Sequence, residues 1–307
     1  MVTGGDVAAA LVYGVIQGAM YGAVALGLSL IWGVMKVINL AHGEFVVLGA
    51  YLLIVASRLA GVDPLLGPFV GLAVGLLLGL AVYAVILHRL IGRVEVITLK
   101  EEMATLLAMF GLSIFLYKLY FIAADRGWLI KLFDTVPQAG LYARLGRLEL
   151  LGVSVEAVKV YVLLLSAVMA VAMHLFLSRT RYGLSIRAVA QDATALALSG
   201  VDPVRVKALA TALGIGLAVM GGGLVALYQS TGINPDLAHT YAPLSFAIVV
   251  MGGPGNLWGT MAAGVVMGLV MSFVYAFTGS LDLGVAAAFI LLVASLVLRP
   301  EGLFSRR

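Results

Sequence analysis

The sequence predicts an all-α membrane protein whose chain crosses the bilayer about eight times. Hydrophobic residues make up 63% of its 307 residues, and charged residues only 11%. Its mean hydropathy is +1.11. A water-soluble domain carries roughly 25% charged residues, so most of the outer surface of this protein must face lipid. Lipid supplies no hydrogen-bond partners for backbone N–H and C=O groups, and helices satisfy these groups internally.

Stretches without Asp, Glu, Lys or Arg locate the spans. A spanning helix needs about 20 apolar residues, so most of these stretches are single passes. Leu237–Leu281 is too long for one pass, and Gly252-Gly253-Pro254-Gly255-Asn256 near its centre breaks a helix. Residues 243–277 are therefore either two spans or a broken, re-entrant pair. The stretches are Val7–Met35, Phe45–Ser57, Pro64–Leu87, Met103–Tyr117, Val160–Ser178, Ala208–Pro235, Leu237–Leu281 and Leu283–Leu298.

Several kinds of function are disfavoured by what the sequence lacks. There is no cysteine, which excludes disulfides and thiolate metal sites. No G-x-x-x-x-G-K-[ST] phosphate-binding loop and no metal-ligand cluster is present. The net charge of +4 would suggest nucleic acid in a soluble protein, but positively charged cytoplasmic loops explain it here. We therefore predict no catalytic residue, no cofactor, no metal site and no nucleic-acid partner.

The distribution of Lys and Arg predicts the orientation. Cytoplasmic loops carry more of these residues than outside loops do. If the N-terminus is outside and the C-terminus inside, the cytoplasmic loops hold the larger number of Lys and Arg residues. The inside set is then Lys36, Arg89, Arg93, Lys100, Arg179, Arg181, Arg187, Arg205, Lys207, Arg299, Arg306 and Arg307. The outside set is Arg58, Arg126, Lys131, Arg144, Arg147 and Lys159. Loop 179–207 is then cytoplasmic and loop 125–159 extracytoplasmic, within one transmembrane domain covering residues 1–307.

The cytoplasmic loop gives the strongest functional signal. Its Leu184–Ser199 stretch is rich in Ala and compatible with a helix. Gly200 suits the left-handed position that ends a helix, and Asp202 with Pro203 can begin the next one. A short helix fixed between two spans in this way is suited to a groove on a partner protein. The alternative is a solvated surface helix without a partner.

Two further segments are candidates for a translocation pathway. Asn39 can cap the second span, and Glu44 begins an otherwise apolar run. A carboxylate near hydrocarbon is costly and usually faces protein or a water-filled path, although it can also sit at the membrane interface. The Gly252–Asn256 breaker can line a cavity or form a plain turn. The candidate pathway residues are Asn39, His42, Glu44, Gly252, Gly253 and Pro254.

Three stretches together resemble the LivH-type permease of branched-chain amino acid ABC importers. They are GVIQGAMYGAVALGLSLIWGVMKVINLAHGEFVVLGAYL, RYGLSIRAVAQDATALALSGVD and GGPGNLWGTMAAGVVMG, in the order and spacing of that family. The generic importer motif begins Glu-Ala-Ala, and Asp192-Ala193-Thr194 stands in its place. By the resemblance, the ATPase-coupling residues are Arg181, Tyr182, Gly183, Arg187, Ala188, Gln191, Asp192, Ala197 and Gly200.

The resemblance implies a non-catalytic permease in the inner membrane of a prokaryote. It also implies a second permease subunit in a hetero-dimer, two cytoplasmic ATP-binding subunits and an extracytoplasmic substrate-binding protein. The implied cargo is a branched-chain or other small hydrophobic amino acid. Two other functions remain open on the residues alone: a secondary transporter, and a channel for amino acids or for small amides such as urea.

Overall fold

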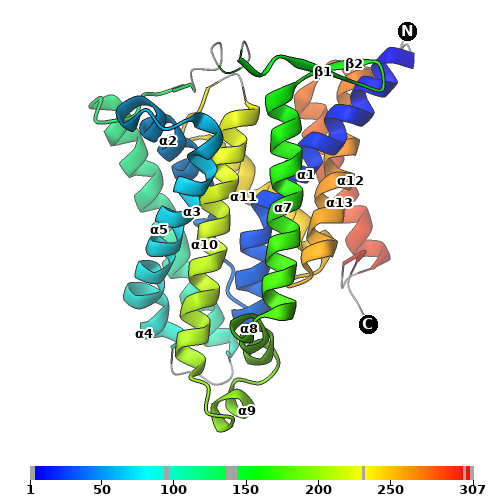
Figure 1. The fold of residues 1–307 in the computed structure, drawn as a ribbon. Helices are drawn as coiled ribbons and strands as arrows, with labels where there is room; N and C mark the ends of the chain where they lie inside the picture. The colour runs from blue at the N-terminus through cyan, green and yellow to red at the C-terminus, as the bar shows by residue number, and fades with distance from the viewer. Residues whose placement is uncertain are drawn as a thin grey trace.

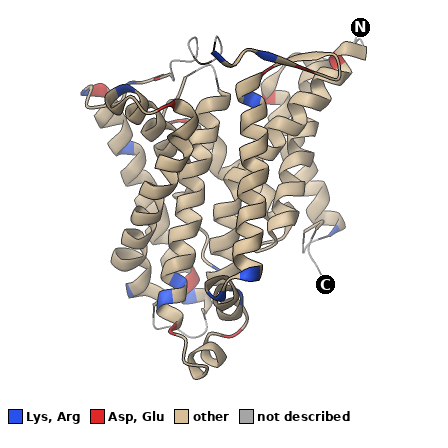
Figure 2. Cartoon of the chain, in the orientation of Figure 1, with Lys and Arg blue, Asp and Glu red and all other residues tan. Residues whose placement is uncertain are grey.

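The protein is a bundle of long helices, which confirms the all-α membrane class (Figure 1). The computed structural model describes residues 4–92, 97–135, 141, 144–229, 232–299 and 302–304. Within these residues, eight helices are long and apolar enough to span a membrane. Lys, Arg, Asp and Glu gather at the two ends of the bundle, and the ribbon between them is largely uncharged (Figure 2). This distribution is what a lipid-embedded middle requires.

The helices follow the uncharged stretches closely. Residues 64–91 form one continuous rod, because α3 runs through the π-helical turn Tyr83–Leu87 into α4 without a break. The helices are α1 (Gly4–Met35), α2 (His42–Ala60), α3 (Gly67–Val82), α4 (His88–Ile91), α5 (Leu99–Asp125), α7 (Ala157–Arg179), α8 (Arg181–Gln191), α9 (Ala193–Leu198), α10 (Pro203–Tyr228), α11 (Leu237–Gly252), α12 (Leu257–Thr278) and α13 (Leu281–Leu298).

The two ends of the bundle differ in what covers them. One end carries the short helices α8 and α9, and we call it the α9 end. The other carries a two-stranded antiparallel hairpin, β1 (Arg147–Leu150) and β2 (Val153–Glu156), and we call it the hairpin end. The predicted loop 125–159 lies at the hairpin end, and the predicted loop 179–207 lies at the α9 end. Hydropathy does not detect the hairpin because its strands are short and largely exposed.

The central layer consists of α1 and α10, which are buried along most of their length. The α1 seam with α12 is glycine-lined, since a Cβ on Gly18 would lie 2.6 Å from the Val265 Cα. The α3 seam with α10 is built in the same way, with a Cβ on Gly79 lying 2.5 Å from the Ala212 Cα. Small residues let helix backbones approach closely where lipid provides no hydrophobic driving force. The glycine ridges therefore pack this chain internally.

The long stretch 237–281 is two helices, α11 and α12, that meet at residues 253–256. With 16 residues, α11 is shorter than a full span, because a 30 Å core needs about 20 residues. It follows a stretch whose described residues, 232–236, are not helical, and that stretch and α11 together make one pass. Eight long helices alone would leave both termini on the same side of the bilayer. The additional pass through α11 places them on opposite sides, as the charge count predicts.

A pattern of helix, non-helical segment and two further helices occurs twice, in opposite directions. The first copy is α1, residues 36–41, α2 and α3; the second is α10, the segment after it, α11 and α12. Helix α1 of the first copy and α12 of the second copy run antiparallel, because Gly18 lies against Val265 and Gly22 lies against Met261. The N-termini of α2 and α11 meet, with a Cβ on Gly43 lying 2.3 Å from the Ala238 carbonyl oxygen.

Candidate functional site

The first part of the predicted coupling loop is a helix fastened to the bundle. Thr180 caps α8: its hydroxyl accepts a hydrogen bond from the Gly183 N–H at 3.0 Å and donates one to the Phe176 carbonyl at 2.7 Å. Ile186 and Val189 are buried, one helical turn apart on the side that faces the bundle. The α8 helix therefore does not move independently of α7 and α10, which it contacts.

Gly183 is required by the geometry of this fastening. A Cβ at this position would lie 2.1 Å from the Phe176 carbonyl oxygen and 2.5 Å from the Leu177 Cα. No side chain fits there without moving one helix away from the other. The resemblance places Gly183 among the ATPase-coupling residues, and the structure buries it against α7, so it can act only by positioning α8.

The prediction of one continuous helix over Leu184–Ser199 is wrong. The helix starts at Arg181 and is interrupted at Asp192, whose backbone is extended (φ −156°, ψ 107°). The Asp192 carboxylate accepts hydrogen bonds from the N–H groups of Thr194 (2.8 Å) and Ala195 (3.0 Å) and so begins α9. Asp competes with the helix backbone in this way and favours caps over helix interiors. The predicted boundaries after the break are confirmed, with Gly200 left-handed (φ 85°) and Asp202 capping α10.

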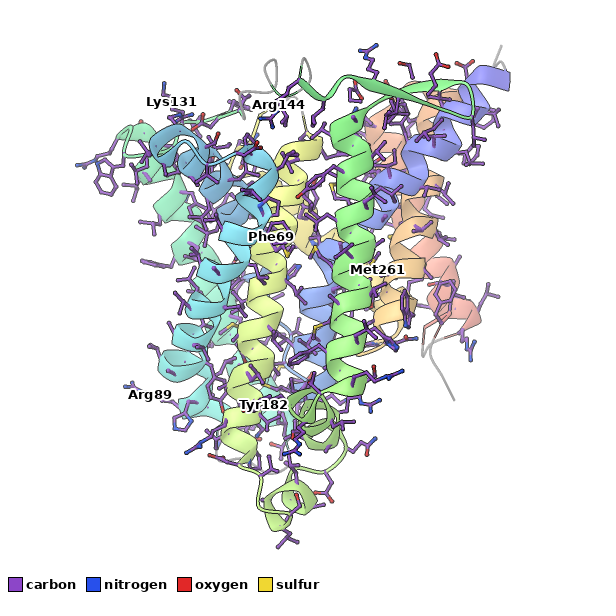
Figure 3. All side chains as sticks on the ribbon, viewed as in Figure 1. Phe69, Arg89, Lys131, Arg144, Tyr182 and Met261 are labelled. Atoms are coloured by element: carbon purple, nitrogen blue, oxygen red, sulfur yellow. The ribbon has the colours of Figure 1, made fainter. Side chains whose placement is uncertain are left out.

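The exposed side of α8 and α9 contains most of the predicted coupling residues. Tyr182 lies at this end of the bundle (Figure 3) and is 68% exposed. Ala188 is half-buried and packs against the core, so it is not part of the free surface. Pattern reasoning missed Leu198, an apolar side chain at the end of α9 that is 86% exposed. The exposed predicted residues are Arg181, Tyr182, Arg187, Gln191, Asp192, Ala197 and Gly200.

The second candidate group lies deep inside the bundle. Glu44 is 2% exposed, and its Oε1 accepts a hydrogen bond from the Ser113 hydroxyl at 2.6 Å. Ser113 is near the middle of α5, so this carboxylate lies about half-way between the two ends of the helix. The Tyr120 hydroxyl donates to the Glu44 carbonyl at 3.0 Å. Glu44 therefore lies inside the bundle and not at the membrane interface at either end of the bundle. It occupies the first turn of α2, where the helix dipole favours a negative charge.

Several polar atoms around Glu44 lack partners within the described structure. They are Glu44 Oε2, both ring nitrogens of His42, and Asn39 Nδ2. The prediction that Asn39 caps α2 directly is wrong. Its Oδ1 accepts from the Ala41 N–H at 3.1 Å, which closes a turn just before the helix, and α2 begins at His42. Buried polar groups without partners are costly, which makes this cluster a candidate site.

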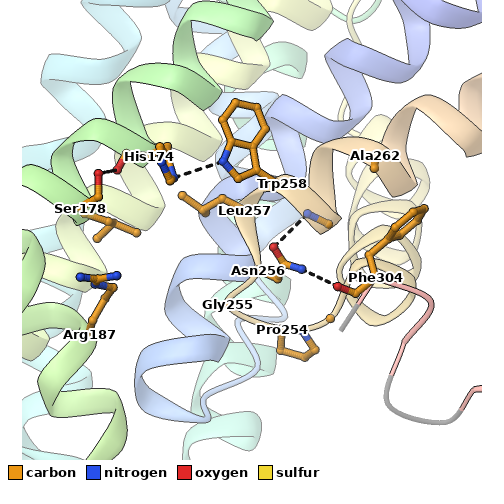
Figure 4. Close-up of a pocket in the computed structure, with 13 residues that line it drawn as sticks. His174, Ser178, Arg187, Pro254, Gly255, Asn256, Leu257, Trp258, Ala262 and Phe304 are labelled. Carbon is orange, nitrogen blue, oxygen red and sulfur yellow. Dashed lines mark hydrogen bonds between the residues drawn. The ribbon is translucent and has the colours of Figure 1, made fainter. Parts of the chain in front are cut away.

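The predicted pathway residues Gly252, Gly253 and Pro254 lie elsewhere, near the α9 end. Gly253 and Pro254 line a cavity of about 650 Å³ together with Arg187 of α8 (Figure 4). In the same cavity lining the Trp258 indole N–H of α12 donates to His174 Nδ1 of α7 at 3.2 Å. Gly252 is buried in the last turn of α11. The six residues therefore form two groups, one deep in the bundle and one beside the coupling helices, because sequence order says nothing about depth.

The turn between α11 and α12 is held in place by its neighbours. Asn256 caps α12 by accepting from the Gly259 N–H at 3.0 Å, and its Nδ2 donates to the Phe304 carbonyl at 2.7 Å (Figure 4). The Gly255 N–H donates to the Ser29 carbonyl of α1 at 3.1 Å. Helix α1 therefore links this turn to the centre of the bundle, and Arg187 faces the same cavity from α8.

Comparison with known proteins agrees with this architecture. The family model described as "Branched-chain amino acid transport system / permease component" matches residues 10–296. The chain belongs to this family. Its membrane-spanning helices and its family membership make it a membrane permease component of a transport system.

Relatives match over nearly the full length. The permease protein BraD of a high-affinity branched-chain amino acid transport system from Pseudomonas aeruginosa is 27% identical, over 96% of this chain and 95% of that protein. The corresponding protein LivH of Escherichia coli K12 is 26% identical, over 95% and 94%. A probable branched-chain amino acid transport permease from Methanocaldococcus jannaschii is 25% identical, over 91% and 86%. No solved structure gives a significant match. The predicted LivH-type resemblance is confirmed.

Proposed function

We propose that this chain is the permease subunit of an ATP-binding-cassette importer in the inner (plasma) membrane of a prokaryote. It carries branched-chain or other small hydrophobic amino acids, as the names of its relatives suggest. It works with a second permease subunit, two cytoplasmic ATP-binding subunits and an extracytoplasmic binding protein. The partner subunits hydrolyse ATP. The relatives come from bacteria and an archaeon, which supports the proposed membrane.

The observation that carries this proposal is the rigid pair α8–α9. Its inner face is fastened to α7 and α10, and its outer face presents Tyr182 and Leu198 without cover from the described chain. Exposed apolar side chains rimmed by polar ones mark sites of protein association. Arg181 and Arg187 supply that polar rim. Because the pair is packed on the spans at one side and exposed at the other, an ATPase that binds the exposed side can transmit its movement to the spans.

The coupling helices and the pathway residues are connected through α8. Helix α8 packs on α1, and the Ser29 carbonyl of α1 accepts a hydrogen bond from the Gly255 N–H at 3.1 Å, so a displacement of α8 reaches the turn between α11 and α12 through α1. The N-terminus of α11 lies at the other candidate group, where Ala238 contacts Gly43 beside His42 and Glu44. We assign Asn39, His42 and Glu44 to the translocation pathway, and Gly252, Gly253 and Pro254 to its cytoplasmic end. Movement of α8 then displaces the half of the bundle at the α9 end, and the pathway opens alternately to the two sides of the membrane.

The test is the substitution Leu198→Asp, compared with Leu151→Asp at the hairpin end. Both leucines are largely exposed, at 86% and 76%, so neither change should affect the fold. Leu151 has φ 53°, a conformation that Asp tolerates. Burial of a leucine contributes about 1.5–3 kcal/mol, or roughly 10- to 150-fold in association. Leu198→Asp should lose that factor in co-purification of the ATPase and in ATP-driven leucine uptake.

The result that would contradict the coupling role is normal ATPase binding by Leu198→Asp together with normal uptake. Ala197→Trp and Arg187→Glu should act in the same direction as Leu198→Asp. Ala188→Trp is a poorer probe, because Ala188 packs against the bundle itself. The secondary-transporter and channel alternatives are tested in the same proteoliposomes. Uptake that continues without ATP or without the ATPase would favour either of them.

A further inference from the structure

A second cavity, of about 470 Å³, lies beside Glu44 between α2, α5 and α11. Its walls are formed by the first turn of α2, the middle of α5 and the first half of α11. Apolar side chains, among them Phe110, Ile114 and Pro243, make up much of the lining. The cavity therefore offers an apolar chamber at the depth where Glu44 meets Ser113.

Glu44 contributes to the cavity lining a carboxyl group whose hydrogen bonding is only half satisfied. Glu44 Oε1 has the Ser113 hydroxyl as its donor, while Oε2 is buried and has no hydrogen-bond partner among the described residues. A buried carboxylate is retained when it is paired or hydrogen-bonded on both sides. Ionised residues inside a membrane domain mark pathways and ligand sites. A ligand with a hydrogen-bond donor could supply the partner that Glu44 Oε2 lacks.

The cavity lining also includes a positively charged residue, Lys118. Lys118 lies on α5, and no described carboxylate lies within ion-pair distance of its ammonium group. Lys118 is five residues beyond Ser113, a rise of about 7.5 Å along the helix. Glu44 and Lys118 therefore line the same cavity, with Lys118 about one and a half helical turns along α5 from the serine that holds the Glu44 carboxyl group. Beside Lys118, the His239 ring packs on that of Tyr117 at 4.6 Å.

The N-termini of two helices meet at the same cavity. Leu40 and Glu44 line it from the start of α2, and Ala238 and His239 from the start of α11. The ends of discontinuous membrane helices bind anionic substrate groups in other transporters, because their dipoles are positive there. The helix dipoles act with Lys118 in favouring an anion, against the Asp236 carboxylate at the start of α11, which accepts a hydrogen bond from the Tyr117 hydroxyl at 2.7 Å. Glu44 favours a cation.

We propose that this cavity is a transit site for an aliphatic amino acid, in which Glu44 receives the ammonium group and Lys118 the carboxylate. Phe110, Ile114 and Pro243 then contact the hydrocarbon side chain. This inference rests on the proposed function, because it assigns Glu44 to the translocation pathway. It adds that the permease itself recognises the zwitterion, beyond any selection by a binding protein.

The test uses thiol labelling, for which the absence of cysteine provides a clean background. Ile114→Cys places a thiol in the cavity wall, and Ile122→Cys places one on the same helix, away from the cavity. Both isoleucines are about half exposed, at 48% and 49%. The permease complex in nanodiscs, without ATP or binding protein, is labelled with N-ethylmaleimide at increasing L-leucine. Ligand at ten times its Kd should slow labelling of the Ile114→Cys variant about tenfold and leave labelling of the Ile122→Cys variant unchanged.

Two analogues and two variants assign the charges. 4-Methylpentanoate lacks the amino group, 3-methylbutylamine lacks the carboxylate, and both should protect the Ile114→Cys thiol less well than leucine does. Glu44→Gln should raise the leucine concentration needed for protection about tenfold, the loss of one charge-assisted hydrogen bond. Lys118→Gln should act similarly, and the analogue that lacks the matching group should be insensitive to each variant. Glu149→Gln, at an exposed position in β1, is the control and should match wild type.

Equal protection with and without Glu44→Gln would overturn the assignment, because Gln reproduces a merely protonated carboxyl group. Absence of protection of the Ile114→Cys thiol by leucine would overturn the site itself. Neither result touches the proposed function, which is measured separately as ATP-driven leucine uptake by the Ile114→Cys complex. Loss of ATP dependence in that assay would contradict the importer instead.

Discussion

Gly183→Ala tests whether the position of the coupling helix matters for transport. A Cβ at residue 183 would lie 2.1 Å from the Phe176 carbonyl oxygen, and ordinary contact begins at 3.4 Å. One methyl group therefore forces α8 and α7 apart by about 1.3 Å. Overpacking of this kind costs typically 1–3 kcal/mol. The higher helix propensity of Ala returns at most about 1 kcal/mol, so the substitution disfavours the seated position of α8.

The expected result is a defect in coupling without a defect in assembly. The spans remain intact because the three atoms nearest to this Cβ all belong to the last turns of α7, at the end of the bundle. Uptake of leucine per ATP hydrolysed should fall several-fold in proteoliposomes that contain the reconstituted importer. The matched control is Gly111→Ala in α5, where a Cβ meets nothing within 4 Å. Normal coupling by Gly183→Ala would refute the argument that α8 must be seated on α7 to transmit movement.

Three other predictions concern the coupling loop, the pathway and the orientation. Asp192→Ala should destabilise α9 by about 0.5–2 kcal/mol through loss of its cap and lower ATPase association, while Asp192→Asn should restore both in the same pull-down. Glu44→Leu should abolish most uptake at normal expression, since it removes the buried carboxylate; wild-type uptake by this variant would return Glu44 to a purely structural role. A single cysteine at Ser199, exposed at the α9 end, should resist an impermeant thiol reagent in intact cells, and labelling from outside would reverse the orientation. Arg93, Arg306 and Arg307, which contribute to the charge count, lie outside the described residues.

Local chemistry explains which parts of the fold the sequence predicts. Lipid requires long uncharged helices, so the spans follow from the positions of charged residues. The end of α9 and the start of α10 follow from Gly200, Asp202 and Pro203, because each acts on its own backbone. Asp192 carries the same kind of signal, but the Ala-rich flanks on both sides favour a continuous helix, and helix propensity alone cannot decide between them.

The candidate site depends on depth, which sequence order does not encode. Glu44 and Pro254 are both next to helix ends, yet one lies in the middle of the bundle and the other beside the coupling helices. The half-length of α11 places its N-terminus against Gly43, and no local pattern predicts that contact. In the sequence Lys118 is only a charged residue within a span, and the fold places it in the same cavity as Glu44.

The glycine seam between α1 and α12 has a consequence for biosynthesis. Helix α1 is made long before α12, the helix with which it forms this glycine seam. Helix α3 likewise packs its glycine face on a helix that is made later, α10. An N-terminal fragment would thus expose its glycine faces to lipid, which gives them nothing to pack against. Membrane quality control can detect a chain that lacks α12 by these open faces, since α12 covers the glycine face of α1.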